Sequence, residues 1–179
     1  TGDVDIKQVN RMDVKGDDIW IADVGSGVNG IIHSADGGQT WRKETLTDPA
    51  PDLDGPMAIT IVDSQTAWAA VRPEANLYRT EDGGDNWTMD APKVSGTNDI
   101  DDICAPDKDT VWAVQNIGGF SGGLTIKVHT VDSTVVRHYS DHNNDYQYEG
   151  VTCYDENTVW VVGFKSIMAS ADLPNGIIR

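Results

Sequence analysis

The sequence has no run of 18 or more uncharged apolar residues, so no segment is long enough to cross a bilayer as a helix. Basic residues are scarce: 13 Lys and Arg stand against 29 Asp and Glu, which gives a formal charge of −16. This acidity repels a phosphate backbone and argues against nucleic acid and anionic membranes as partners. Two cysteines make no disulfide framework, and 179 residues suffice for one domain with an apolar core.

Glutamate is also scarce, because 24 of the 29 acidic residues are aspartate, and the chain contains 18 glycines. Aspartate favours turns, where its carboxylate accepts hydrogen bonds from neighbouring backbone, whereas glutamate is a good helix former. This bias predicts many tight turns and therefore an all-β fold.

A short block that ends in tryptophan recurs along the chain. Its four copies end at Trp20, Trp68, Trp112 and Trp160, at steps of 48, 44 and 48 residues. In the last three copies an aspartate stands five residues before the tryptophan, at Asp63, Asp107 and Asp155. A fixed period of about 45 residues that holds several short strands is typical of propeller blades.

Each repeat unit divides into four short strands. In the second unit, segments 57–62, 67–71, 76–80 and 86–90 are rich in β-branched or aromatic residues and are bounded by Gly, Pro, Asp or Asn. We therefore expect a β-propeller with four four-stranded blades, in a single repeat domain over residues 1–179. The blades are expected at about 1–47, 48–92, 93–142 and 143–179.

A second block, centred on an aspartate and a glycine pair, follows each tryptophan block. The carboxylate can accept backbone N–H groups across a turn, the glycines can adopt positive φ, and the terminal tryptophan can cover the hairpin. We expect these residues to clamp turns, because a catalytic acid is not needed once in every blade. The predicted clamp residues are Ser34, Asp36, Gly38, Trp41, Thr80, Asp82, Gly84, Trp87, Asp132 and Asp172, the last two from blocks that keep only the head of the pattern.

Segments 34–41 and 80–87 resemble the Asp-box, also called the bacterial neuraminidase repeat. The run Asp107-x-x-Thr110-x-Trp112-Ala113-Val114 is most similar to repeats of the photosystem II assembly factor family, with sortilin-type receptors as further relatives. The resemblance implies a propeller whose Asp-box turns lie on the face away from the binding surface. It does not imply a shared reaction.

The number of units departs from this superfamily, whose propellers generally have six or more blades. Four units leave two sheet faces bare, which is a liability for a repeat array without capped ends. Three arrangements are open: an arc of a larger propeller, an arc paired with a second arc from another copy or a partner, and a small four-bladed ring.

The sequence assigns no catalytic residue. A sialidase needs an arginine cluster and a tyrosine nucleophile, and the Arg-Ile-Pro element of that family is absent. A xyloglucanase needs two opposed carboxylates, which the abundant aspartate supplies in sequence without showing their spacing. A fragment of an Asp-box glycoside hydrolase, xyloglucanase-like or sialidase-like, therefore remains the alternative to a non-catalytic module.

One polar segment has oxygen ligands at alternate positions. Asp141, Asn143 and Asp145, followed by Glu149, match the opening of a calcium loop. The match is incomplete, since Tyr146 replaces the glycine of the sixth position and Thr152 the glutamate of the twelfth. The alternatives are a calcium site and a solvated polar turn, and no other cofactor is expected.

The remaining cysteines and histidines are expected to be structural. Cys104 and Cys153 each end the first strand of their units, and corresponding positions in neighbouring blades are about 10 Å apart, beyond the reach of a disulfide. Both are therefore predicted to be buried free thiols. His33 and His129 each precede the clamp block by one residue, and we expect them on the strand surface.

The longer and more variable connections gather at one end of the predicted blades, which is typical of a binding surface on a rigid scaffold. The predicted function is a non-catalytic, extracytoplasmic β-propeller module that recognises a protein or glycan partner through these loops, with self-association or a second propeller arc as a further option. The extracytoplasmic location follows from the Asp-box resemblance and the acidic composition. The candidate ligand-binding residues are Arg72, Glu74, Phe120, Asp141, Tyr146 and Tyr148.

Overall fold

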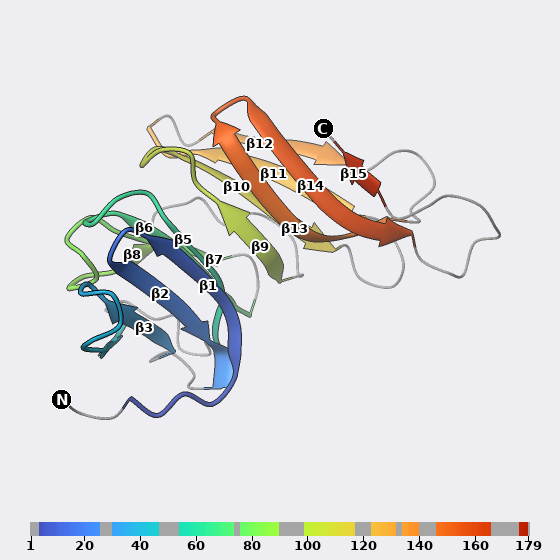
Figure 1. Ribbon diagram of the computed structural model, residues 1–179. Coiled ribbons are helices and arrows are strands. Elements are labelled where there is room, and N and C mark those ends of the chain that lie inside the picture. Colours follow the sequence, from blue (N-terminus) through green and yellow to red (C-terminus); the bar gives the residue numbers. More distant parts are fainter. Residues whose placement is uncertain are drawn as a thin grey trace.

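The computed structural model describes residues 4–25, 30–46, 54–73, 76–89, 99–116, 123–131, 134–139, 146–165 and 176–178. These residues form four antiparallel sheets whose strands lie in chain order, which confirms the predicted all-β fold (Figure 1). No helix within these ranges has the length and apolar character needed to span a membrane.

Three of the sheets have four described strands and the last has three. The first sheet contains β1 (Val9–Lys15), β2 (Asp18–Asp23), β3 (Ile31–Ser34) and β4 (Arg42–Glu44). The second contains β5 (Gly55–Ile61), β6 (Ala67–Arg72), β7 (Asn76–Thr80) and β8 (Thr88–Met89). The third contains β9 (Ile100–Cys104), β10 (Thr110–Asn116), β11 (Gly123–His129) and β12 (Thr134–Tyr139). The fourth contains β13 (Tyr146–Asp155), β14 (Thr158–Lys165) and β15 (Gly176–Ile178).

In the last three sheets, the aspartate five residues before the tryptophan closes the hairpin between the first two strands. Asp63 Oδ1 accepts the backbone N–H groups of Gln65 and Thr66, at 2.9 and 2.8 Å. Asp107 Oδ1 accepts those of Asp109 and Thr110 at 2.8 and 2.7 Å, and Asp155 accepts that of Asn157 at 2.9 Å. A short side chain that bonds its own turn two residues on explains why aspartate recurs at this point of the repeat.

The tryptophan-bearing second strands pack each sheet against the next one. We call the side of a sheet that carries this tryptophan its Trp face, and the opposite side its rear face. Because side chains alternate along a strand, the tryptophan and the residue two further on share the Trp face, while their neighbours lie on the rear face. At the first interface, Trp20 and Ala22 join Ala67, Ala69 and Val71 from the rear face of the second sheet in one apolar cluster. At the second, Trp68 and Ala70 join Val111 and Ala113 from the rear face of the third sheet. At the third, Trp112 and Val114 join Val159 and Val161 from the rear face of the fourth sheet.

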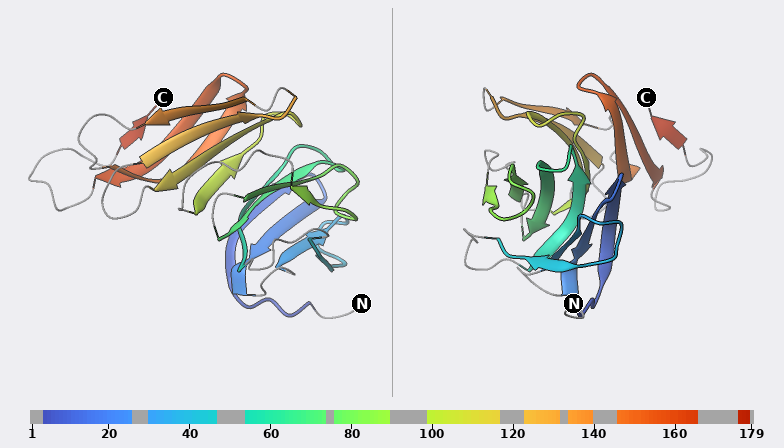
Figure 2. Two further views of the ribbon diagram at one scale, coloured as in Figure 1. Left: turned by 180° about the vertical axis from the view of Figure 1, so that it is seen from behind. Right: turned by 60° about the vertical axis from the view of Figure 1, so that its left-hand side comes forward.

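The first strands of the four sheets form the inner row of the molecule. Contacts run in sequence from β1 to β5, from β5 to β9 and from β9 to β13. Both views of Figure 2 show the sheets following one another in chain order, with the N-terminus at one end and the C-terminus at the other. This radial order of meander sheets is that of a β-propeller, as predicted. The blade limits given above remain predictions.

The expected separation of the two cysteines was wrong. Both are free thiols, but Cys104 is buried and Cys153 only half-buried, and the two side chains are hydrogen-bonded to each other. Cys104 pairs with Trp112 and lies on the Trp face of its sheet, whereas Cys153 pairs with Val159 and lies on a rear face. Their spacings to the tryptophan differ by one residue, so they do not occupy corresponding positions, and they face each other across two sheets.

The expected position of His33 on the strand surface was also wrong. His33 is buried and stacks on Trp20, with ring centroids 3.8 Å apart and planes at 13°. Arg79 lies over Trp68 in the same way, at 5.3 Å from the ring centroid. In the third sheet the matching residue is Lys127, 5.6 Å from the Trp112 ring, and not His129, because β10 and β11 continue to the pair Thr110 and His129.

Candidate functional site

The inner strands of all four sheets surround one pocket of about 370 Å³. Its wall combines aliphatic side chains with charged and polar ones, and more of its exposed surface is polar than apolar. The lining residues are Arg11, Met12 and Asp13 of β1, Ile59, Thr60 and Ile61 of β5, Asp102, Ile103 and Cys104 of β9 with Ala105 beyond it, and Val151, Thr152 and Cys153 of β13. Its convergent charged and polar groups make this concave surface a candidate binding site.

Arg11 links three of the four sheets at this pocket. Its Nε lies 3.3 Å from Asp102 Oδ1 on β9, and its Nη2 donates to the carbonyl oxygen of Glu149 on β13 at 3.0 Å. The Arg11 side chain is 37% exposed, so this guanidinium still meets solvent. A planar guanidinium with several fixed donors suits carboxylate and carbonyl recognition.

Two carboxylates join neighbouring inner strands. Asp13 Oδ2 accepts the backbone N–H of Ile61 on β5 at 2.7 Å, and Asp102 Oδ2 accepts that of Val151 on β13 at 3.0 Å. Burial raises the pKa of Asp102 above its usual range, while the hydrogen bond from Val151 and the charge of Arg11 oppose that rise. These carboxylates satisfy backbone donors that the sheet edges would otherwise leave unpaired.

Arg11 and Asp102 were not among the predicted site residues, although the repeat places them at equivalent positions. Arg11 pairs with Ala22, and Asp102 pairs with Val114. Ala22 and Val114 each lie two residues beyond the tryptophan of their own strand. Aligning the repeat units on their tryptophans would have shown an arginine and an aspartate at the same position of two units, which indicates an ion pair between them.

The predicted ligand-binding residues have different outcomes. Arg72 ends β6 at the same end of the sheets as Arg11; its Nε lies 2.6 Å from Asp99 Oδ2, and its side chain is 40% exposed. Tyr148 is buried in the cluster between the third and fourth sheets, so its ring is not available for surface contact, and that assignment is corrected. Glu74, Phe120 and Asp141 lie outside the described residues, as does the side chain of Tyr146.

The predicted calcium loop lies mostly outside the described residues, which begin again at Tyr146. Its last candidate ligand, Glu149, is an exposed residue within β13, so the segment from Tyr146 onward is a strand and does not continue as a twelve-residue loop. In the part of the chain that is described, no three His, Cys, Asp or Glu side chains are grouped to hold a metal ion. Calcium binding by Asp141, Asn143 and Asp145 stays a prediction.

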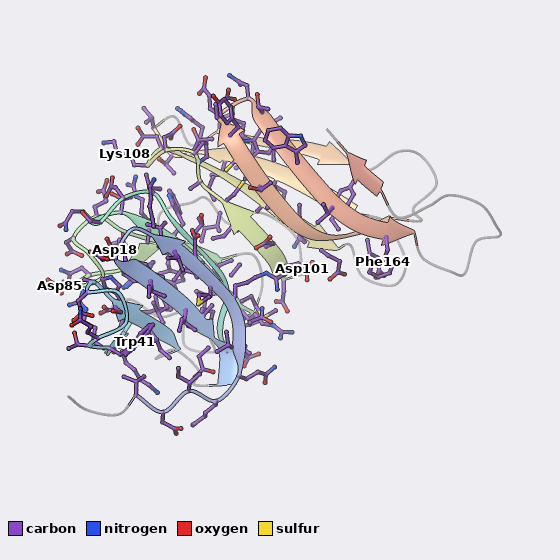
Figure 3. The ribbon with its side chains drawn as sticks, in the orientation of Figure 1. Asp18, Trp41, Asp85, Asp101, Lys108 and Phe164 are labelled. Atoms are coloured by element: carbon purple, nitrogen blue, oxygen red, sulfur yellow. The ribbon has the colours of Figure 1, made fainter. Side chains whose placement is uncertain are left out.

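The clamp residues lie at the opposite end of the sheets from Arg11 and Arg72. In the first turn Asp36 accepts the backbone N–H and the hydroxyl of Thr40, at 2.8 and 2.6 Å, and Ser34 Oγ accepts the N–H of Gly38 at 2.8 Å. The turn of Thr80 and Asp82 repeats this pattern, with Asn86 in place of Thr40. In Figure 3, Asp18 and Asp85 lie close to the labelled Trp41 of the first turn, and Asp101 lies well away from it. Asp132 and Asp172 lie outside the described residues.

The Asp36 turn predicts a stability that depends on acid pH. The hydrogen bonds from Thr40 lower the pKa of Asp36 from 3.8 to about 2, so the folded state binds this proton less readily than the unfolded chain. The contribution is complete above about pH 4 and is lost as the pH falls toward 2. We expect Asp36→Asn to lower the melting temperature near neutral pH, and the difference from the parent chain to shrink between pH 4 and 2. A difference that is the same at both ends of this range would contradict the assignment.

The chain is similar in sequence to known proteins. The family model described as Photosynthesis system II assembly factor YCF48 matches residues 2–121. A curated relative, the photosystem II assembly lipoprotein Ycf48 of Synechococcus sp. (strain CC9902), is 30% identical over 124 residues, which are 66% of this chain and 34% of the relative. The chain thus spans about a third of that relative's length.

Solved structures show the same fold. The structure titled "YCF48 bound to D1 peptide" has a TM-score of 0.57 and 17% identity, over 87% of this chain and 46% of that one. A Niastella koreensis GH74 enzyme has a TM-score of 0.59 and 22% identity, over 83% of this chain and 23% of that one. Since the family model covers residues 2–121 of 179, the chain belongs to the YCF48 photosystem II assembly factor family of Asp-box β-propellers.

Proposed function

We propose that this chain is a non-catalytic propeller module that binds an extended segment of a partner protein. Two observations support the proposal: the chain belongs to the YCF48 family, and its inner strands surround a pocket. A related solved structure is titled for YCF48 bound to a D1 peptide. An assembly role and an extracytoplasmic location belong to the same proposal, since the curated relative is named an assembly lipoprotein.

The pocket supports peptide binding through its strand edges. Among the described strands, β1, β5, β9 and β13 each pair with one neighbour only, and their other edges face the pocket. Such edges offer backbone donors and acceptors to an extended peptide, and adjoining pockets then select its side chains. Asp13 and Asp102 already accept the N–H groups of Ile61 and Val151, and Asn10 and Arg11 donate to the carbonyl oxygens of Met57 and Glu149. The peptide would therefore use the remaining positions of these edges.

Arg72 is the proposed anchor for the partner at the loop end. One N–H of its guanidinium holds Asp99, and the exposed remainder can contact a carbonyl or carboxylate of the bound segment. Glu74, Phe120, Asp141 and Tyr146 are proposed contacts on the connections of this end. With a formal charge of −16 on the chain, the long-range field favours a segment that carries positive charge.

The test uses two extended peptides of equal length, one with basic and one with acidic side chains at alternate positions, titrated by fluorescence anisotropy. We expect the basic peptide to bind more tightly and to lose affinity as salt is added. Arg72→Ala should weaken binding about tenfold, as loss of one charge-assisted hydrogen bond does. The matched control is Lys108→Ala. Lys108 is an exposed cation at the end of the sheets that carries the clamp residues (Figure 3), so this variant should leave affinity unchanged.

Two results would overturn the proposal. Equal losses of affinity in Arg72→Ala and Lys108→Ala would show that the peptide does not bind at the end of the sheets that carries Arg72. Absence of peptide binding together with turnover of a xyloglucan or sialoside would instead support the glycoside hydrolase alternative.

A further inference from the structure

Two cysteine side chains meet at the pocket, where the third sheet packs on the fourth. Cys104 ends β9, Cys153 lies within β13, and both line the pocket. Their thiols are hydrogen-bonded to each other and belong to the apolar cluster that joins the two sheets. The sequence contains only these two cysteines, at positions that differ by 49 residues. The fold therefore brings all the thiols of this chain to one point.

The two strands hold these side chains in register. Asp102 Oδ2 accepts the backbone N–H of Val151 at 3.0 Å, which joins β9 to β13 two residues before each cysteine. Because side chains alternate along a strand, a step of two residues returns to the same face. Neither strand has a bulge within this step. Cys104 therefore follows Asp102 on one side of the interface, and Cys153 follows Val151 on the other.

The first interface brings the same two repeat positions into contact with other residues. Asp13 has the position of Cys104, opposite the tryptophan of its sheet, and Ile61 has the position of Cys153, opposite the residue before the tryptophan. Asp13 Oδ2 accepts the backbone N–H of Ile61 at 2.7 Å. The meeting of the two cysteines thus follows from the way in which neighbouring units pack, and it recurs in the repeat.

We infer that Cys104 and Cys153 are a modification site, at which oxidation by a small-molecule disulfide joins the third and fourth sheets through a disulfide bond. The two thiols are already in contact, so the bond closes between side chains that the fold has paired. The link would fix the wall of the pocket where β9 meets β13. The inference does not depend on the proposed binding of a peptide, because its chemistry needs only the two thiols and the oxidant.

The bond forms by thiol–disulfide exchange, with oxidised glutathione as the oxidant. Cys153 is only half-buried and reacts first: its thiolate attacks one sulfur of the oxidant, forms a mixed disulfide and releases one glutathione thiolate. The hydrogen bond with Cys153 and burial raise the pKa of the Cys104 thiol, so it reacts second. Cys104 attacks the sulfur of Cys153 and releases the other glutathione thiolate. The two cysteine protons pass to the two glutathione thiolates, so two protein thiols are oxidised and one glutathione disulfide is reduced.

The experiment exposes the reduced, folded parent chain to oxidised glutathione. We expect the number of thiols that iodoacetamide modifies after denaturation to fall from two to none. Peptide mapping without reductant should find Cys104 joined to Cys153 within one chain. The oxidised chain should melt about 5 to 10 °C above the reduced chain, because a bond that closes a long loop restricts the unfolded state.

Two single variants test the order of the steps. Cys104→Ala should stop at the mixed disulfide of Cys153 with glutathione, whereas Cys153→Ala should react slowly, since Cys104 is buried. Neither variant should show the rise in melting temperature, and circular dichroism establishes that each is folded. The parent chain decides the inference by itself: two thiols that both stay free after prolonged exposure, a bond that forms only between two chains, or an oxidised chain that melts no higher than the reduced one would refute it.

Discussion

Replacing Gly84 by alanine is expected to lower the free energy of unfolding by about 3 kcal/mol. Gly84 has φ of +100°, a conformation that residues with a side chain rarely adopt. A Cβ atom there would lie 2.7 Å from Cη2 of Trp20 and 2.9 Å from the carboxyl carbon of Glu44, both in the neighbouring sheet. The loss therefore combines backbone strain with overpacking at the interface of the first two sheets.

Gly16→Ala separates these two causes. Gly16 also has positive φ, at 65°, but a Cβ atom there meets nothing within 4 Å. We expect it to cost about 1 kcal/mol, from the left-handed backbone alone. Urea unfolding followed by tryptophan fluorescence measures both variants. If the two substitutions cost the same, the Asp-box turn of the second sheet is not packed on Trp20 as the structure shows.

The contact at Gly84 shows why the Asp-box recurs in this fold. The turn clamps its own hairpin through Asp82 and Thr80, and the conformation that the glycine pair adopts brings the turn against the tryptophan of the preceding sheet. Trp87, which follows the turn, meets Trp20 edge to face at a centroid distance of 5.5 Å. A local hydrogen-bond motif therefore also positions two sheets relative to each other.

Features that depend on local chemistry could be predicted from the sequence. The recurring aspartate, glycine and tryptophan act within one hairpin, so composition predicted the all-β fold and the spacing of the repeats predicted the propeller blades. Segments 67–71 and 76–80, which were expected as strands, correspond to β6 and β7. The turn chemistry of Asp36 and Asp82 is likewise contained within a few residues.

Features that depend on which face a residue occupies could not be read from spacing to the nearest motif. Cys104 and Cys153 differ by one residue in their distance from the tryptophan, and because side chains alternate, that difference turns them toward each other. His129 is a different case: it lies on the same face as Lys127 but two residues further along β11, so Lys127 covers Trp112. The link between Arg11 and Asp102 joins residues 91 positions apart and depends on the curvature of the inner row.

Replacing Trp68 by alanine is expected to cost about 4 kcal/mol, the usual loss when a fully buried aromatic side chain is truncated. Its ring is 0% exposed and belongs to the cluster that joins the second and third sheets, with Ala70, Ile103 and Val111. Truncation also removes the ring under Arg79, whose Nη1 bonds the carbonyl oxygen of Lys108 across the same interface at 3.0 Å. We therefore expect the third sheet to lose its support from the second.

Two further variants distinguish packing from hydrogen bonding at this position. Trp68→Phe should recover most of the stability, because the indole Nε1 has no hydrogen-bond partner among the described residues and a phenyl ring still fills much of the space. Trp41→Ala should cost less than Trp68→Ala, since Trp41 is only half-buried and covers its own turn, where its Nε1 bonds the Gly38 carbonyl at 3.0 Å. Urea unfolding of all three variants ranks them. If Trp41→Ala cost as much as Trp68→Ala, the tryptophans of the two repeat blocks would be equivalent, and the Trp face would not be what holds one sheet on the next.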